Sequence, residues 1–130
     1  MKYVILIHAN PEPWGHPTGD FTAEGRAMDP AERERRRGTF ETLMGEISAS
    51  GELVMAEALA APTASTVYRW AAGGSVATDG PYAETKEQLA GFFQVDCATR
   101  ERAEEIAERF AHPGDVIELR PAMWGDGDDR

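Results

Sequence analysis

Hydrophobic residues follow one another along the chain in patterns typical of strands and of amphipathic helices. Residues 3–8 form a nearly unbroken β-branched and aliphatic run, which predicts a strand buried on both faces in the middle of a sheet. Shorter runs predict further strands at residues 52–59, 66–70, 75–78, 91–97 and 116–120. Gly73-Gly74 is interpreted as the tight turn of an inserted hairpin.

Two helices are predicted between these strands. Asp29 as N-cap and Pro30 at the first helical position begin the first helix, and Gly51 ends it. Its apolar stripe consists of Phe40, Leu43, Met44 and Ile47. Thr99 caps the second helix, which ends before Pro113-Gly114. The stripe of that helix consists of Ala103, Ile106, Ala107 and Phe110.

Residues 9–28 form an apolar-poor segment that holds neither a long helix nor a strand, because Pro and Gly interrupt it repeatedly. Structureless loops of about 20 residues are uncommon in compact domains unless they bind something. We therefore predict a lid over a site, or a flap on a partner subunit. The polar tail 125–130 is expected to be frayed.

Without the hairpin, the order of elements is β-α-β followed by β-α-β, which predicts an α+β fold of the ferredoxin-like, split βαβ type. Both helices then cover one face of the sheet. The strands carry more apolar surface than one helix layer can cover, notably at Tyr3, Phe92, Phe93, Tyr68 and Trp70. Because exposed apolar area of that size marks a partner, we expect a homodimer whose sheets face each other.

Composition bounds the class of protein. The 130 residues carry a formal charge of −10, and we expect one domain over residues 1–130. The acidity argues against nucleic acid and anionic membranes as partners, and the arginines among residues 33–37 are interpreted as a solvated helix face. The lone Cys97 allows no internal disulfide, and the apolar run at residues 3–8 is too brief for a signal peptide or membrane span. A cytoplasmic location is expected.

His8 and Asp79 are the candidate catalytic residues. His8 ends the first strand, where a side chain enters whatever pocket lies beyond the sheet, and imidazole titrates near neutrality. Asp79 begins the turn Asp79-Gly80-Pro81-Tyr82, where burial at a cleft edge would suit it to accept protons. The alternatives are a half-buried structural histidine and an Asp that bonds backbone amides in the turn.

Three further residues near this turn are candidates for binding a substrate. Glu84 and Lys86 lie two apart, so on an extended segment they share a face and can pair with each other or bracket an anionic substrate. Tyr82 or Lys86 would orient the substrate. The alternative is that Glu84 and Lys86 are ordinary solvated charges.

No metal site or cofactor is predicted. His16 and His112 lack metal-ligand spacing to other His, Cys or carboxylate residues, and no phosphate-binding or dinucleotide fingerprint occurs. Cys97 lies between a strand and a helix and is interpreted as small core filler.

Residues 76–93, read as VATDGPYAETKEQLAGFF, closely resemble the signature of the DGPF proteins within the YCII-related superfamily, with Tyr82 at the usual Phe. The two ends of the chain, residues 2–8 and 116–121, also resemble that family. The segment between His8 and Asp29 is longer and richer in Pro and Gly than the family pattern.

The resemblance implies a ferredoxin-like, dimeric α/β-barrel fold and acid–base chemistry by a His and an Asp. Two functions follow from the residues and the resemblance together. One is a cofactor-free enzyme or binder of a small molecule, in which Asp79 and His8 transfer protons. The other is a non-catalytic dimeric regulatory module that binds a protein partner such as a sigma factor.

Overall fold

A computed structural model of the chain describes residues 1–83 and 86–123. Its strands are β1 (Lys2–Ala9), β2 (Leu53–Ala58), β3 (Thr66–Ala71), β4 (Gly74–Asp79), β5 (Gln88–Asp96) and β6 (Asp115–Pro121). Its helices are α1 (Ala23–Arg26), α2 (Pro30–Ser50) and α3 (Arg100–Arg109), with the short 3₁₀ helices η1 (Thr18–Asp20) and η2 (Pro62–Ala64). The predicted mixture of helices and strands is therefore confirmed.

Four strands form one antiparallel sheet in the order β2-β5-β1-β6. The prediction that residues 3–8 form a central strand is confirmed, because β1 pairs with β5 on one side and with β6 on the other. Its apolar run supplies side chains to both faces of the sheet.

The helix ends lie where their local sequences predict. The carboxylate of Asp29 accepts hydrogen bonds from the backbone amides of Ala31 and Glu32, and Gly51 ends α2 with a φ of 83°. Thr99 caps α3 by accepting from the amide of Arg102. These caps satisfy amides that have no partner inside a helix.

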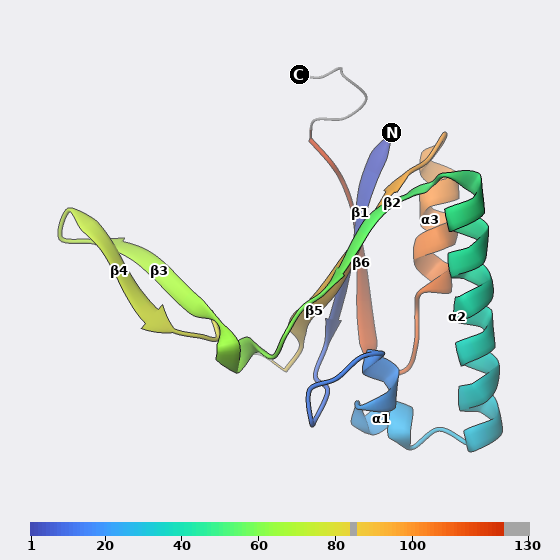
Figure 1. Cartoon of the computed structure of the whole chain (residues 1–130), viewed down its shortest axis with the longest axis horizontal. Coiled ribbons are helices and arrows are strands. Elements are labelled where there is room, and N and C mark those ends of the chain that lie inside the picture. The colour runs from blue at the N-terminus through green and yellow to red at the C-terminus, as the bar shows by residue number, and fades with distance from the viewer. Residues whose placement is uncertain (84–85, 124–130) are drawn as a thin grey trace.

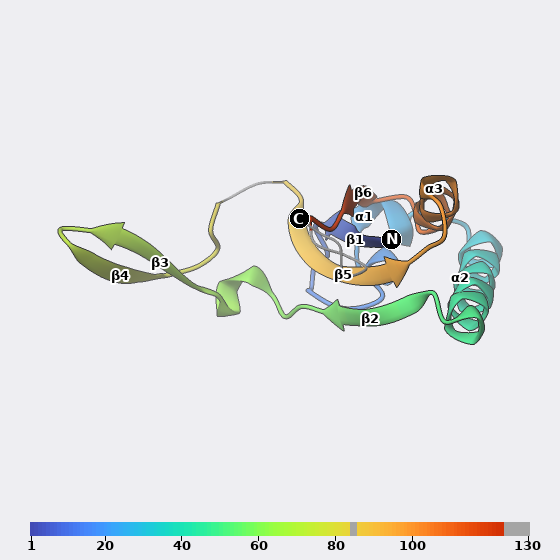
Figure 2. The same ribbon diagram turned by 90° about the horizontal axis from the view of Figure 1, so that it is seen from above.

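Helices α2 and α3 lie side by side on one face of the sheet (Figures 1 and 2). The core between the helices and the sheet contains Tyr3, Ile5, Leu43, Ile47, Val95, Cys97, Ala103, Ile106, Ala107 and Phe110. The whole predicted stripe of α3 is buried, whereas in the predicted stripe of α2 Phe40 remains 37% exposed. Cys97 is 1% exposed within this core, so its predicted role as core filler is confirmed.

Strands β3 and β4 form a separate two-stranded sheet, the hairpin of residues 66–79. The predicted turn is shifted by one residue, because Ala71 pairs with Gly74 and leaves Ala72 and Gly73 as the two-residue loop. Both loop residues have positive φ, 53° and 80°, as a type I′ turn requires. The hairpin extends from the side of the sheet opposite the helices (Figures 1 and 2).

Residues 9–28 are packed against the rest of the chain and contain η1 and α1. Thr18 and Thr22 are buried, and the indole of Trp14 donates to the carbonyl of Leu59 at 2.8 Å. The guanidinium of Arg26 donates to two carbonyls of the same segment. The segment is thus held in place by side chains that the sequence pattern alone does not connect, and a lid function for it stays a prediction.

Within residues 1–83 and 86–123, no helix has the length and hydrophobicity needed to cross a membrane. The predicted frayed tail at residues 125–130 lies outside the described part of the chain.

Candidate functional site

The candidate site lies on the face of the four-stranded sheet that α2 and α3 leave uncovered, which we call the open face. Alternate residues of a strand point to opposite faces. Tyr3 and Ile5 of β1 point into the core, so Leu6 and His8 lie on the open face. Cross-strand pairing places Val116 beside His8, and Glu118 beside Leu6.

His8 and Glu118 form a diagonal pair on this face. The Nε2 atom of His8 lies 3.1 Å from Oε1 of Glu118, across 110 residues of sequence. The two side chains are 30% and 37% exposed, so a solute can reach them although neither is fully solvated. An imidazole held by a carboxylate is a common arrangement for proton transfer.

Electrostatics keep the Glu118 carboxylate ionised. The guanidinium of Arg120 and then the ring of His8 donate hydrogen bonds to it, and together they hold the pKa of Glu118 below its usual value. An ionised carboxylate can only accept, so Nε2 of His8 is the donor. In the neutral imidazole the lone pair then lies on Nδ1, which is the atom free to accept a proton.

A cleft of about 830 Å³ lies beyond the end of β1, where the chain continues into Asn10 and Pro11. It is lined by Asn10, Pro11, Glu12, Pro13, Trp14, Ala61, Pro62, Thr63, Pro81 and Gln88. His8 does not line the cleft itself, but Asn10 lies two residues after it in the chain, and Gln88 pairs with the intervening Ala9. The cleft's mixture of apolar rings and a few amide and hydroxyl groups is typical of sites that bind small organic molecules.

The turn at residues 79–82 contributes to this cleft through Pro81. Gly80 packs so closely on the segment around η2 that an added Cβ would lie 2.4 Å from Cβ of Ser65. The amide of Gly80 also donates to the carbonyl of Ser65 at 2.7 Å. The motif therefore has a clear packing role, which brings Pro81 to the cleft wall.

The structure does not join the predicted catalytic pair. Asp79 ends β4 in the two-stranded sheet, whereas His8 belongs to the four-stranded sheet. Among the described residues, no hydrogen bond or ion pair connects Asp79 to His8, and none connects the Asp79 side chain to a backbone amide of its turn. A proton relay between them stays a prediction.

The remaining predicted binding residues are dispersed. Tyr82 is 73% exposed, and the guanidinium of Arg69 lies 5.2 Å from the centre of its ring. Lys86 is exposed, and Glu84 lies outside the described residues. Neither Tyr82 nor Lys86 lines the cleft at the end of β1, so their roles toward a substrate stay predictions.

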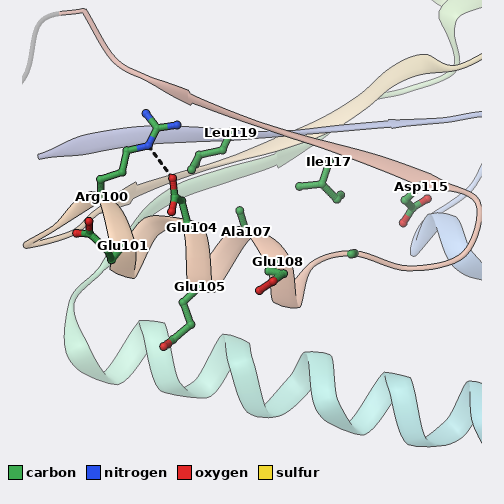
Figure 3. A pocket seen from close by; sticks show the side chains of 10 residues that line it. Arg100, Glu101, Glu104, Glu105, Ala107, Glu108, Asp115, Ile117 and Leu119 are labelled. Carbon is green, nitrogen blue, oxygen red and sulfur yellow. Dashed lines mark hydrogen bonds and ion pairs between the residues drawn. The ribbon is translucent and has the colours of Figure 1, made fainter.

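A second groove, of about 650 Å³, lies between α3 and the edge strand β6 (Figure 3). Glu101, Glu104, Glu105 and Glu108 of α3 line it together with Ile117 and Leu119 of β6. Asp115 closes one end, where burial raises the pKa of its carboxyl and the hydroxyl of Thr18 donates to it. Arg100 also lines the groove and pairs with Glu104, so the lining carries five carboxylates and one guanidinium and is acidic.

Glu118 and Asp115 are the residues that the sequence interpretation missed. Glu118 interrupts an otherwise aliphatic strand, and this pattern marks a polar side chain on a sheet surface. Only the pairing of β6 with β1 connects it to His8. No sequence signal connects Asp115 to Thr18.

The other histidines contact backbone carbonyls. Nε2 of His16 lies 3.0 Å from the carbonyl of Leu59, and Nδ1 of His112 lies 3.0 Å from the carbonyl of Pro113. Within the described parts of the chain, no three His, Cys, Asp or Glu side chains gather as a metal site requires.

Comparisons with known proteins give one consistent family. The model of the YCII-related domain matches residues 1–121. The uncharacterized protein R00369 of Rhizobium meliloti (strain 1021) is 36% identical over 106 residues, which cover 78% of this chain and 86% of that protein.

Proposed function

Because the chain belongs to the YCII-related family, we propose that it binds a small organic molecule and moves a proton on it with His8 as the general base. The observation that carries this proposal is the 3.1 Å contact between His8 and Glu118 on an uncovered sheet face, and a cleft of about 830 Å³ at the end of the same strand β1 supports it.

Glu118 orients the imidazole and stabilises the charge that forms when His8 takes a proton. Its carboxylate accepts from Nε2, which leaves Nδ1 to take a proton from the substrate. General bases of this kind contribute about 10²–10⁴-fold to a rate. In this proposal Glu118 takes the partner role that the sequence had suggested for Asp79.

The lining of the cleft supports a small polar molecule with an apolar part as the substrate class. The amide of Asn10 can bond a polar group, and the indole of Trp14 offers an apolar wall. A molecule with a proton next to a carbonyl group fits both the lining and the base. Asp79, Tyr82, Glu84 and Lys86 remain proposed contacts to this substrate from the sequence motif.

Solvent deuterium exchange tests this proposal. Small carbonyl compounds and carboxylates are incubated with the protein in deuterated water, and incorporation at carbon is followed by NMR. We expect the wild type to accelerate exchange for one class of compound, and His8→Ala and Glu118→Gln to lose most of that acceleration. His112→Ala, whose ring contacts Pro113 instead, is the control and should retain it. Equal rates in His8→Ala and wild type would rule out this base.

We also propose the ferredoxin-like arrangement of the DGPF type and a homodimer formed through the open faces. The strand order β2-β5-β1-β6, with both long helices on one face, supports the arrangement. Met55, Leu89 and Val116 support the dimer, because they are 44%, 38% and 52% exposed on that face. Light scattering should give twice the chain mass of 14.2 kDa. A monomer at micromolar concentration would contradict the dimer.

A second function, a regulatory module that binds a basic segment of a protein partner such as a sigma factor, is favoured by the acidic groove in Figure 3. Four glutamates from α3 line an apolar floor there. In this case Glu104→Lys with Glu108→Lys should abolish partner binding, whereas His8→Ala should not affect it. Measuring both variants against the same partner separates the two functions.

A further inference from the structure

The hairpin of residues 66–79 exposes two aromatic side chains. Tyr68 and Trp70 are 68% and 76% exposed. They lie two residues apart on β3, opposite the small residues Ala77 and Ser75, so both rings project from one face of the hairpin. Exposed aromatic area of this kind marks a contact surface.

The composition of the hairpin is that of an interface core. Arg69 and Asp79 are its charged residues, although 28% of the whole chain is charged. Interface cores are depleted of charge and enriched in Tyr, Trp and Arg, which are adjacent here as residues 68–70.

The hairpin also needs a covering surface for physical reasons. A two-stranded sheet alone is at best marginally stable in water. At its base, the amide of Gly80 bonds the carbonyl of Ser65, whereas β3 and β4 pair with each other and not with the larger sheet. A partner that covers Tyr68 and Trp70 would supply the missing burial.

A second copy of the chain is the occupant that the geometry favours. The hairpin extends from the side of the sheet that faces away from α2 and α3 (Figures 1 and 2). A second copy set against the open face therefore lies in its path. The open face offers exposed apolar side chains at Met55, Leu89 and Val116. In a two-fold dimer the same contact forms twice, which doubles the buried area.

We infer that the hairpin of each copy lies across the open face of the other, so that Tyr68 and Trp70 wall the partner's His8–Glu118 pair. This inference rests on the dimer and the site proposed above. Val116 and Leu89 are the cross-strand neighbours of His8, so rings that cover them also cover the pair. Excluding water there strengthens the contact between the imidazole and the carboxylate. The site is then complete only in the dimer.

Disulfide trapping between two differently tagged variants tests the contact. One variant carries Ser75→Cys, which leaves both aromatic rings in place, and the other carries Val116→Cys or Leu89→Cys. The native Cys97 is buried, and burial raises the pKa of its thiol, so it competes poorly. We expect mixed disulfides with both open-face variants. The matched control is Glu41→Cys, an exposed position on α2, which should give none.

Quenching of Trp70 fluorescence by acrylamide provides a second measurement. In a Trp14→Phe, Trp124→Phe variant the remaining indole reports on the hairpin, and its quenching should fall several-fold when dilute protein is concentrated into the dimer. The hairpin contact would be overturned, and the dimer left intact, by the following result: light scattering shows a dimer, no mixed disulfide forms, and Trp70 stays fully accessible to acrylamide. A monomer under all conditions would overturn both. Mixed disulfides without catalysed deuterium exchange would uphold the contact and contradict only the chemistry.

Discussion

The hydroxyl of Thr18 lies 2.9 Å and 3.0 Å from the two carboxylate oxygens of Asp115, and this contact joins η1 to the first residue of β6. Thr18 is 7% exposed, and burial raises the pKa of Asp115 even though the hydroxyl bond opposes the shift. The carboxylate therefore anchors the long segment 9–28 at a cost in desolvation.

The first prediction concerns the charge of Asp115. A raised pKa means that the folded state holds the proton of Asp115 more tightly than the unfolded state does. The ionised carboxylate therefore destabilises the fold as the pH rises above 3.8, the ordinary pKa of an Asp side chain. Asp115→Asn keeps an acceptor for Thr18 and removes the charge. We expect the free energy of unfolding of Asp115→Asn to equal that of the wild type at low pH and to exceed it increasingly as the pH rises, as measured by urea unfolding.

Asp115→Ala is the comparison for this experiment, because it removes the acceptor as well. Leaving the buried Thr18 hydroxyl without its partner should cost about 1–3 kcal/mol at neutral pH. If Asp115→Asn were less stable than the wild type throughout the pH range, the carboxylate would be stabilising and the argument from burial would be wrong.

The second prediction concerns Arg102, which connects α3 to α2 and to the start of β2. Its guanidinium lies 2.7 Å from Glu46 and 2.8 Å from Glu52, and it also pairs with Glu105. Arg109 and Arg102 lower the pKa of Glu46 from 4.5 to about 2, and Arg102 also lowers that of Glu52. Because the folded pKa values are depressed, this stabilisation is present above pH 4.5 and is lost as pH falls toward 2.

Arg102→Met should therefore lower stability at neutral pH and flatten the loss of stability between pH 4.5 and pH 2. Arg100→Met is the control, because Arg100 pairs with Glu104 on the exposed surface of the same helix. The two variants are compared by urea unfolding across this pH range, because urea is uncharged and does not screen ion pairs. An unchanged pH slope in Arg102→Met would show that the network does not contribute.

The third prediction concerns the turn at Gly80. A Cβ added there would lie 2.4 Å from Cβ of Ser65 and 3.1 Å from the carbonyl oxygen of Pro62. We expect Gly80→Ala to cost about 1–3 kcal/mol and to displace Pro81 from the cleft wall. Gly45→Ala in α2 meets nothing within 4 Å and should instead stabilise by about 0.5–1 kcal/mol. Thermal unfolding of both variants tests this prediction. A Gly80→Ala protein as stable as the wild type would contradict it.

The fourth prediction concerns the anchor of the segment 9–28 near the cleft. The indole of Trp14 donates to the carbonyl of Leu59, and Trp14→Phe removes this donor while keeping an aromatic ring. The loss should cost about 0.5–1.5 kcal/mol. Hydrogen exchange should show faster exchange of amides in residues 9–28, whereas those of α3 should not change. Equal acceleration in α3 would indicate global destabilisation.

The sequence alone determined the local features of this protein. Asp29, Gly51 and Thr99 mark helix ends because a cap depends on residues within one turn of it. The apolar stripe of α3 and the apolar run of β1 could likewise be predicted, because the hydrophobic period of a helix or strand is a local property of the sequence. The motif at residues 76–93 and the two ends of the chain pointed to the family that the comparison with the YCII-related domain shows.

Only the tertiary structure decided which distant residues meet. His8 contacts Glu118 because β1 pairs with β6, and Thr18 contacts Asp115, 97 residues further along the chain. Neither contact has a periodic signature in the sequence. The close approach of Gly80 to Ser65 at the base of the hairpin is likewise a contact that no residue pattern encodes. The local sequence determines which helices and strands form, but long-range side-chain contacts depend on the register with which the strands assemble into the sheet.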